Sequence, residues 1–561
     1  MIKSHFQLAL RNIIKHKLFS LINIAGLSLG LTAAIILFLF AKYQLTYDQH
    51  HTHADDLYIV YKERITPTGV QPTYDTWHPL LSQLMTDFPE IKSGTRINES
   101  GVMVEANGNR FNESCYYVDP DYFTVFDFPL ALGDNNNPLP DNNAVIISKE
   151  LAKKYFGDEN PIGKSLIINF EQLHTVSGVL EEYPRNSSIA SDLIFPIKSQ
   201  PDYADWENDW GSSSLFTIIQ LDESASSEAL AAKFPFLIKK LWNEDVQKRT
   251  NFKLLPIAAT FETFIGDPKD VYILVIVGIG LVLIVTINFI NLSTARTLDR
   301  SKEVSMRKVF GAQRGQLIQQ FLYESVVMSL MALAISILAA KILLPVINQH
   351  FELHLYFSLR NPVVYLTLLI VSILLGLIAG IIPSSILSGL QIQRGLKSFT
   401  SERARMRNVL VTLQFGLSIV LLISVIMIGK QINFMKTTDM GYQADNQLII
   451  PISVNDFAEV DAAQQRLESF KQLIAKHSAV RSISSSRHVP LNWSGSNVFV
   501  KPEGWQDEPL RMRYTFHDAD FLSTYQIPVI EGSGFKDDAF GDQRESVMIN
   551  EATMRDRKSV V

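Results

Sequence analysis

Residues 295–316 read ARTLDRSKEVSMRKVFGAQRGQ, and this segment decides the fold. It is polar and strongly basic. On each side of it lies an apolar run that is longer than the core helix of a soluble protein requires. Met306, Val309 and Phe310 recur at i, i+3 and i+4, which places them on one helix face. A short cationic helix between two membrane spans belongs on the cytoplasmic side. The pattern predicts a helix at 296–315 that a soluble partner can bind.

Five apolar runs predict membrane-spanning helices. Each has about 18 or more apolar residues with few charges, which is the length that a bilayer core requires. They lie near residues 18–41, 271–295, 325–347, 363–390 and 409–429. Large polar blocks separate them, in which short alternating apolar segments mix with helical ones. We expect an α-helical membrane protein with α+β extracytoplasmic domains and about five transmembrane helices.

Lysine and arginine residues set the expected topology. The N-terminal segment is basic, with Phe6, Leu10, Ile13 and Ile14 on one helical face, which suits a helix on an anionic membrane surface. The loops 296–314 and 391–408 are also basic, so we place both in the cytoplasm with the N-terminus. The blocks 43–270 and 430–561 then lie outside. Nothing in the sequence indicates nucleic-acid binding.

The domain boundaries follow from the same runs. Residues 1–42 form an N-terminal amphipathic helix and the first span, and residues 43–270 form an outer domain with predicted helices at 148–156 and 226–242. Residues 271–395 hold three spans and the 296–315 helix. Residues 396–430 are a cytoplasmic linker and the fifth span, and residues 431–561 are a second outer domain.

The two outer blocks resemble each other. DPDYF at 119–123 and DADFL at 518–522 are followed at equal spacing by proline and glycine, and VIIS at 145–148 matches VMIN at 547–550. The simplest account is a duplicated module, with chance similarity as the alternative. By that symmetry the second domain is expected to continue beyond residue 561, with three more spans after it, so we expect a truncated chain.

Several possible chemical motifs have simpler explanations. Residues 157–165 look like a phosphate loop, but five residues separate the two glycines where the pattern needs four, so we expect no ATPase motif and no enzyme. The acidic and histidine residues between Asp48 and Asp56 could bind a divalent metal. Solvation or capping at the membrane exit is the simpler reading, and we expect no metal. Cys115 is the only cysteine, so an intrachain disulfide is impossible.

Two pairs of glycines are candidate packing residues. Gly26 and Gly30 lie four apart in the first span, and Gly376 and Gly380 lie four apart in the fourth. Small residues at this spacing let two helices approach closely. No acidic pair lies in the middle of a span, which argues against a proton- or sodium-coupled carrier.

The chain resembles the FtsX/MacB-type permeases of ABC transporters. The resemblance lies in LALRNIIKHKLFSLINIAGLSLG at 8–30, YDQHHTHADDLYIVY at 47–61, INFINLSTARTLDRSKEVSMRKVFGAQRGQLIQQFLYES at 287–325 and GIIPSSILSGLQIQRGLK at 380–397. It implies a MacB-like periplasmic core domain and a coupling helix docked on an ATPase subunit. The residues that would lie at or near that contact are Glu303, Arg307, Lys308, Gly311 and Ala312. It also implies the inner membrane of a bacterium.

The resemblance implies mechanotransmission, in which ATP-driven dimerisation of cytoplasmic subunits moves the spans and then the outer domains. ATP and magnesium would be held by the partner ATPase, and this chain would hold no cofactor. The implied task is export or extraction of an amphiphilic substrate such as a peptide, drug or lipoprotein. The alternative is a non-transporting regulator that activates a periplasmic partner such as a cell-wall hydrolase. Further expected partners are membrane lipid, a second permease copy or the missing second half, and a periplasmic adaptor. No substrate-binding or catalytic residue is indicated.

Overall fold

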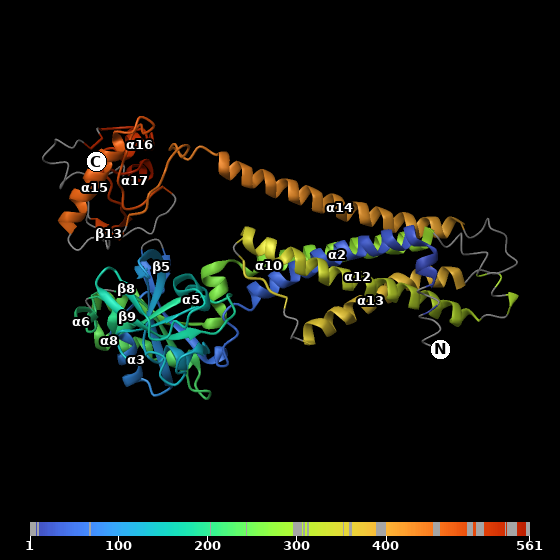
Figure 1. Cartoon of the computed structure of the whole chain (residues 1–561), viewed down its shortest axis with the longest axis horizontal. Coiled ribbons are helices and arrows are strands. Elements are labelled where there is room, and N and C mark those ends of the chain that lie inside the picture. Colours follow the sequence, from blue (N-terminus) through green and yellow to red (C-terminus); the bar gives the residue numbers. More distant parts are fainter. Residues whose placement is uncertain are drawn as a thin grey trace. The chain divides into compact units, whose positions relative to one another are not determined.

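A computed structural model of the chain divides into two compact units, residues 1–427 and residues 428–561. The first unit holds the membrane helices and a large domain inserted between two of them (Figure 1). The structure describes residues 7, 11–66, 69–201, 203–211, 213–242, 244–295, 304, 306, 309–310, 313–351, 353–357, 362–388, 400–452, 460–490, 497–500, 510–532, 534–535 and 547–556.

Within these ranges, five helices are long and apolar enough to cross a membrane. They are α2 (Lys17–Leu45), α10 (Pro268–Ala295), α12 (Arg314–Phe351), α13 (Pro362–Ser388) and α14 (Thr400–Thr437). Each exceeds the roughly 20 residues that a bilayer core requires. The five coincide with the five apolar runs, so the predicted spans are confirmed. Leu27, Phe289, Met328 and Ala379 meet in one apolar core, which joins α2, α10, α12 and α13.

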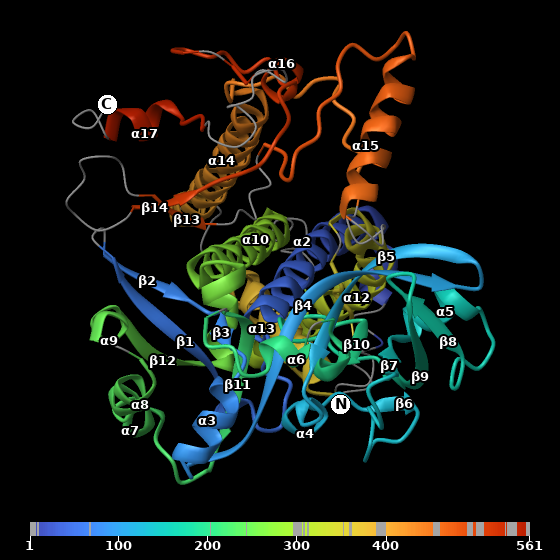
Figure 2. The same ribbon diagram turned by 90° about the vertical axis from the view of Figure 1, so that its left-hand side faces the viewer.

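The inserted domain (residues 46–267) is built on a twelve-stranded sheet with the central order β12-β1-β11-β4-β5-β10-β7-β9-β6 (Figure 2). The strands are β1 (Leu57–Thr66), β2 (Gly69–Thr73), β3 (Thr76–Trp77), β4 (Ile91–Ala106), β5 (Asn109–Val118), β6 (Leu130–Leu132), β7 (Ala144–Ile147), β8 (Ser165–Ile168), β9 (Gln172–Leu180), β10 (Leu193–Pro196), β11 (Ser213–Leu221) and β12 (Thr250–Pro256). Most neighbours are antiparallel, while β10 runs parallel to β5 and β7 parallel to β9. Strand β1 lies between β11 and β12, so an early strand pairs with the two last ones.

Short helices pack on this sheet, and the predicted α+β class is confirmed. They are α3 (Leu80–Asp87), α4 (Tyr122–Val125), α5 (Lys149–Phe156), α6 (Tyr203–Trp206), α7 (Ser227–Ala231), α8 (Phe234–Leu241) and α9 (Glu244–Arg249). Helix α5 begins after Ser148, whose Oγ accepts a hydrogen bond from the backbone N–H of Leu151, as an N-cap does. It ends at Gly157, where φ is 65° and glycine avoids the strain of the left-handed region. This turn occupies the start of the sequence that resembled a phosphate loop.

The helical structure predicted at 226–242 is confirmed except for an interruption. The structure has two helices there, α7 and α8, with a break at Ala232 and Lys233. Pro235 is the second residue of α8, where its missing N–H leaves no bond unmade. The same residue could not continue α7, because its ring would clash with the preceding turn.

A buried ion pair joins two segments of the inserted domain. The Arg96 guanidinium donates from Nε to Asp119 Oδ2 at 2.9 Å and from Nη2 to Asp119 Oδ1 at 2.7 Å. Its Nη1 donates to the carbonyl oxygen of His78 at 2.7 Å. Both charged side chains are nearly buried, so removing one of them would leave the other as an unpaired buried charge. The pair ties β4, which holds Arg96, to the turn that precedes α4.

The second unit contains α15 (Val460–Ala475), β13 (Asn497–Val500), β14 (Leu510–Arg513), α16 (Phe521–Thr524) and α17 (Glu551–Asp556). The two copies of the repeated motif fold alike locally. Helix α4 starts three residues after Asp119, and α16 starts three residues after Asp518. Asp119 pairs with Arg96, and Asp518 pairs with Lys471 at 2.8 Å. The copies differ at VMIN, because residues 547–550 form no strand whereas the matching β7 pairs with β9 and β10.

Candidate functional site

The predicted coupling helix is described only in part. Glu303, Arg307, Lys308, Gly311 and Ala312 lie outside the described residues. Of its described residues, Val304 is buried against Leu317 and Phe321 near the start of α12. Three apolar side chains are instead exposed: Met306 at 64%, Val309 at 70% and Phe310 at 84%. These three, the coupling patch, are the residues that the sequence placed on one helix face.

The four candidate packing glycines lie against neighbouring helices. Gly30 of α2 faces Val285 of α10, and a methyl group built on Gly30 would clash with the Val285 side chain. On α13, a Cβ at Gly376 would lie 2.7 Å from Val326 Cα, and one at Gly380 would lie 2.9 Å from Ser325 Oγ. Gly26 is looser, with its nearest outside atom, Asn288 Nδ2, 3.8 Å from such a Cβ. The α12–α13 and α2–α10 contacts therefore depend on missing side chains.

Hydrogen bonds between helices add to these close contacts. Ser336 Oγ of α12 donates to the carbonyl oxygen of Ser28 in α2 at 3.0 Å. Ser329 Oγ of α12 donates to the carbonyl oxygen of Ser372 in α13 at 2.7 Å. Such bonds between membrane helices typically contribute about 1 kcal/mol each to helix association. The two bonds therefore join α12 to both α2 and α13.

Asp48 joins the membrane helices to the inserted domain. It follows α2 by three residues and is fully buried, with its backbone in the left-handed region at a φ of 55°. Its Oδ1 accepts hydrogen bonds from Ser187 Oγ at 2.6 Å and from the Ser188 backbone N–H at 2.8 Å. Its Oδ2 accepts from Ser188 Oγ at 2.5 Å and from Thr260 Oγ1 at 2.6 Å. One carboxylate therefore binds three segments: the exit of α2, a loop of the inserted domain and the approach to α10.

Asn186 reinforces the same junction from the inserted domain. Its Nδ2 donates to the carbonyl oxygens of Tyr43 at 3.0 Å and Thr46 at 2.9 Å, at the end of α2. The Asp48 backbone N–H donates back to the carbonyl oxygen of Asn186 at 3.0 Å. Beside these bonds, Ala41 of α2 and Val271 of α10 share an apolar core with Phe261. We call these polar and apolar contacts together the Asp48 junction.

His50 and His51 pack beside the Asp48 junction, and their rings contact other aromatic rings. Their rings lie 3.9 Å apart, and the His51 ring also contacts the rings of Phe126 and Phe128. The Asp127 backbone N–H donates to His51 Nδ1 at 3.1 Å. Burial, with the neighbouring His50, lowers the pKa of His51 to about 3, so the ring is neutral at pH 7. In the part of the chain that the structure describes, no three His, Cys, Asp or Glu side chains are grouped to hold a metal ion.

Cys115 is buried in a core of the inserted domain, and burial raises the pKa of its thiol to about 12. A thiol that stays protonated at pH 7 is a poor nucleophile. The side chain therefore serves as core packing.

Two sequence models match the chain. The MacB-like periplasmic core domain matches residues 20–235, and the FtsX-like permease C-terminal matches residues 275–392. The first model covers α2 and most of the inserted domain, and the second covers the three spans α10, α12 and α13 with the segment between the first two.

Individual proteins related to this chain share only about a quarter of its residues in the aligned regions. The macrolide export ATP-binding/permease protein MacB of Neisseria meningitidis serogroup A is 27% identical over 243 residues, covering 42% of this chain and 36% of that protein. The chain thus spans about a third of the length of that relative. The uncharacterized ABC transporter permease YvrN of Bacillus subtilis is 23% identical over 409 residues, covering 69% of this chain and 97% of that one. The crystal structure of the periplasmic region of MacB from Actinobacillus actinomycetemcomitans covers 37% of this chain and 92% of its own, at 16% identity and a TM-score of 0.29.

Proposed function

Because this chain belongs to the FtsX/MacB-type family of ABC transporter permeases, we propose that it couples ATP hydrolysis by a separate cytoplasmic ATPase to movement of its periplasmic domain. The Asp48 junction carries this proposal. Helices α2 and α10 bracket the inserted domain in sequence, and Asp48 hydrogen-bonds both the domain and the segment leading to α10. A relative movement of α2 and α10 must therefore load these bonds or break them.

The coupling patch supports contact with the ATPase. Met306, Val309 and Phe310 are three large apolar side chains that stay exposed between α10 and α12. Exposed aromatic and methionine side chains are enriched at protein interfaces, where their burial contributes much of the affinity. In this proposal the ATPase covers the patch and holds ATP and magnesium, and Glu303, Arg307, Lys308, Gly311 and Ala312 lie at or near the same contact.

Affinity purification of the chain from membranes tests the contact. We expect an ABC ATPase to co-purify with the wild type and to be lost from the Phe310→Asp variant, because a carboxylate would be buried without a partner. The matched control is Phe236→Asp in the inserted domain, where Phe236 is 70% exposed and distant in sequence from the patch. Equal recovery of the ATPase with Phe310→Asp and with the wild type would exclude the patch as the contact.

Hydrogen exchange on the purified complex tests the coupling. We expect residues 46–53, 186–189 and 257–265 to change their exchange together when the ATPase is trapped with ATP and vanadate, because Asp48 and its neighbours link all three. Unchanged exchange in these segments, with changes elsewhere in the spans, would mean that motion does not pass through the junction.

The remaining parts of the proposal concern location and cargo. We place the protein in the inner membrane of a bacterium, with the coupling patch in the cytoplasm and the inserted domain in the periplasm. The Neisseria relative is named a macrolide export protein. For this chain we propose export or extraction of an amphiphilic substrate such as a peptide, drug or lipoprotein. A cell-wall hydrolase among the co-purifying proteins, with no export adaptor, would favour a regulator instead.

A further inference from the structure

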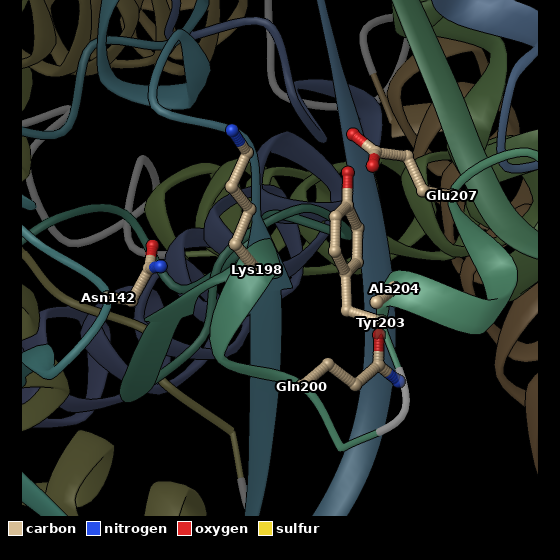
Figure 3. A pocket seen from close by; sticks show the side chains of 6 residues that line it. All are labelled: Asn142, Lys198, Gln200, Tyr203, Ala204 and Glu207. Carbon is tan, nitrogen blue, oxygen red and sulfur yellow. The ribbon is translucent and has the colours of Figure 1, made fainter.

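A polar hollow lies beside α6 in the inserted domain. The hollow has a volume of about 370 Å³, which is within the range of small-ligand sites. Its lining residues are Asn142, Lys198, Gln200, Tyr203, Ala204 and Glu207 (Figure 3).

Tyr203 gives the hollow a fixed wall. Its hydroxyl oxygen accepts a hydrogen bond from Arg96 Nη2 at 3.2 Å, and Arg96 is itself held by Asp119. The side chain is buried, so the ring cannot swing away. An oxygen that accepts from Arg96 keeps its own hydrogen to donate. Figure 3 shows the Tyr203 hydroxyl, the Lys198 amine and the Glu207 carboxylate directed to the same side.

Other lining groups have hydrogen-bonding capacity left unused. Gln200 Oε1 is buried and has no hydrogen-bond partner. Among the described residues, the Lys198 ammonium and the Glu207 carboxylate form no ion pair with each other or with a neighbour. Because Gln200 Oε1 has almost no accessible surface, a ligand in the hollow meets the two charged groups and not this oxygen.

The combination of groups restricts the ligand. A phosphate or a metal ion would match only one of the two charges, and a neutral sugar would match neither. A short peptide with free ends carries an ammonium group, a carboxylate and backbone N–H groups. Three residues extend over about 10 Å, which suits a hollow of this size. We propose that the hollow binds a short free peptide, with Glu207 facing its ammonium group and Lys198 its carboxylate.

Ligand-observed NMR titration of the full-length chain in detergent micelles tests the proposal, with trialanine as the probe. We expect a dissociation constant of about 1 mM, because both charged partners are exposed to water. Acetylation of the amino end should weaken binding about threefold, and amidation of the carboxyl end should do the same. Glu207→Gln should remove the effect of acetylation, and Lys198→Gln should remove the effect of amidation, as in a double-mutant cycle.

Matched variants show whether the effects are local. Glu223→Gln and Lys239→Gln change exposed charges elsewhere in the inserted domain and should leave all affinities unchanged. Within the described part of the chain, neither Glu207 nor Lys198 makes a side-chain hydrogen bond or ion pair, so their variants should unfold at the wild-type temperature. Equal binding of free and doubly capped peptide, or no binding of trialanine at several times about 1 mM, would overturn the proposal. Both results are independent of the ATPase contact and the Asp48 junction.

Discussion

Asp48 shows how one side chain can hold a junction whose other members are far away in sequence. It accepts four hydrogen bonds, and among the residues that the structure describes no lysine or arginine pairs with it. Asparagine in its place has nearly the same shape, but its NH₂ group cannot accept. In Asp48→Asn, at least one of Ser187, Ser188 and Thr260 then faces a donor instead of an acceptor.

We therefore expect Asp48→Asn to lower the free energy of unfolding by about 1–3 kcal/mol. The unfolding temperature of the detergent-solubilised protein measures the stability. ATP-dependent hydrogen exchange at residues 186–189 measures the coupling, which should weaken. Asp55→Asn is the control, since Asp55 is exposed nearby. A wild-type unfolding temperature and unchanged exchange in Asp48→Asn would show that the junction does not depend on this carboxylate.

His51 makes the inserted domain sensitive to acid. Burial, with the neighbouring His50, lowers its pKa to about 3, while an unfolded histidine titrates near 6.5. Between pH 3 and pH 6.5 this histidine is therefore protonated in the unfolded state and neutral in the folded state. The free energy of unfolding is unaffected by this difference above about pH 6.5, and it decreases as the pH falls below that value. Between about pH 7.5 and pH 5.5 the loss from this histidine is about 1 kcal/mol.

The unfolding temperature at these two pH values measures the effect, and His51→Gln should reduce the difference. Other groups also face the pair, because the carboxylates of Asp48 and Asp127 lie near the two rings and favour their protonated forms. Burial also lowers the pKa of His174, so some acid sensitivity should remain in the variant. An identical pH dependence in His51→Gln and the wild type would contradict the assignment.

The role of Asp48 could not be predicted from the sequence. Its partners lie 139 to 212 residues away, and no local spacing marks them. The sequence instead suggested that Asp48 belonged to a possible metal cluster with the neighbouring histidines. The packing glycines were visible, because a four-residue spacing within an apolar run has a local meaning. The hollow was not visible, since residues 198–207 carry no recognisable motif and Asn142 lies far from them in sequence.

At the scale of the helices, close packing of α12 on α13 should make Gly376 intolerant of even one methyl group. Alanine stabilises a helix interior relative to glycine by roughly 1 kcal/mol, so the same substitution without a clash should be neutral or stabilising. A Cβ at Gly376 would lie 2.7 Å from Val326 Cα, whereas nothing lies within 4 Å of a Cβ at Gly416 in α14. We expect Gly376→Ala to destabilise by about 1–3 kcal/mol and Gly416→Ala not to destabilise.

Size-exclusion chromatography after heating gives the temperature at which each glycine variant loses its monodisperse peak. If both variants behave alike, the α12–α13 contact is looser than the structure has it.

The membrane helices could be predicted from composition, whereas a break within a helical segment could not. Five apolar runs gave five spans because length and hydrophobicity alone decide whether a segment fits a bilayer. In the inserted domain, the periodic pattern at 226–242 hid the break between α7 and α8, although Pro235 was visible. A proline can lie in the first turn of a new helix or mark the end of the preceding one, and its position in the sequence alone does not distinguish the two.

At the scale of the whole molecule, we expect the inserted domain and the coupling patch to lie on opposite sides of the membrane. Cys115 is fully buried, so cysteines introduced at exposed positions report without background. A membrane-impermeant maleimide applied to intact cells should label Lys239→Cys in α8 and spare Gln316→Cys next to the patch. Disruption of the cells should expose Gln316→Cys to the reagent, which controls for its reactivity. The reverse pattern would invert the topology.

The pairing of β1 with β12 also sets a minimum time for folding of the inserted domain during synthesis. Tyr58 and Pro256 are neighbours in the sheet, so the sheet cannot close until nearly the whole inserted domain has been made and moved across the membrane. At a synthesis rate of about 5–20 residues per second, that interval is on the order of 10 to 40 seconds. During this interval the unpaired edge of β1 is accessible to proteases, chaperones and other nascent chains. The amount of protein in the cell should therefore depend on how well chaperones protect this edge from proteolysis and aggregation.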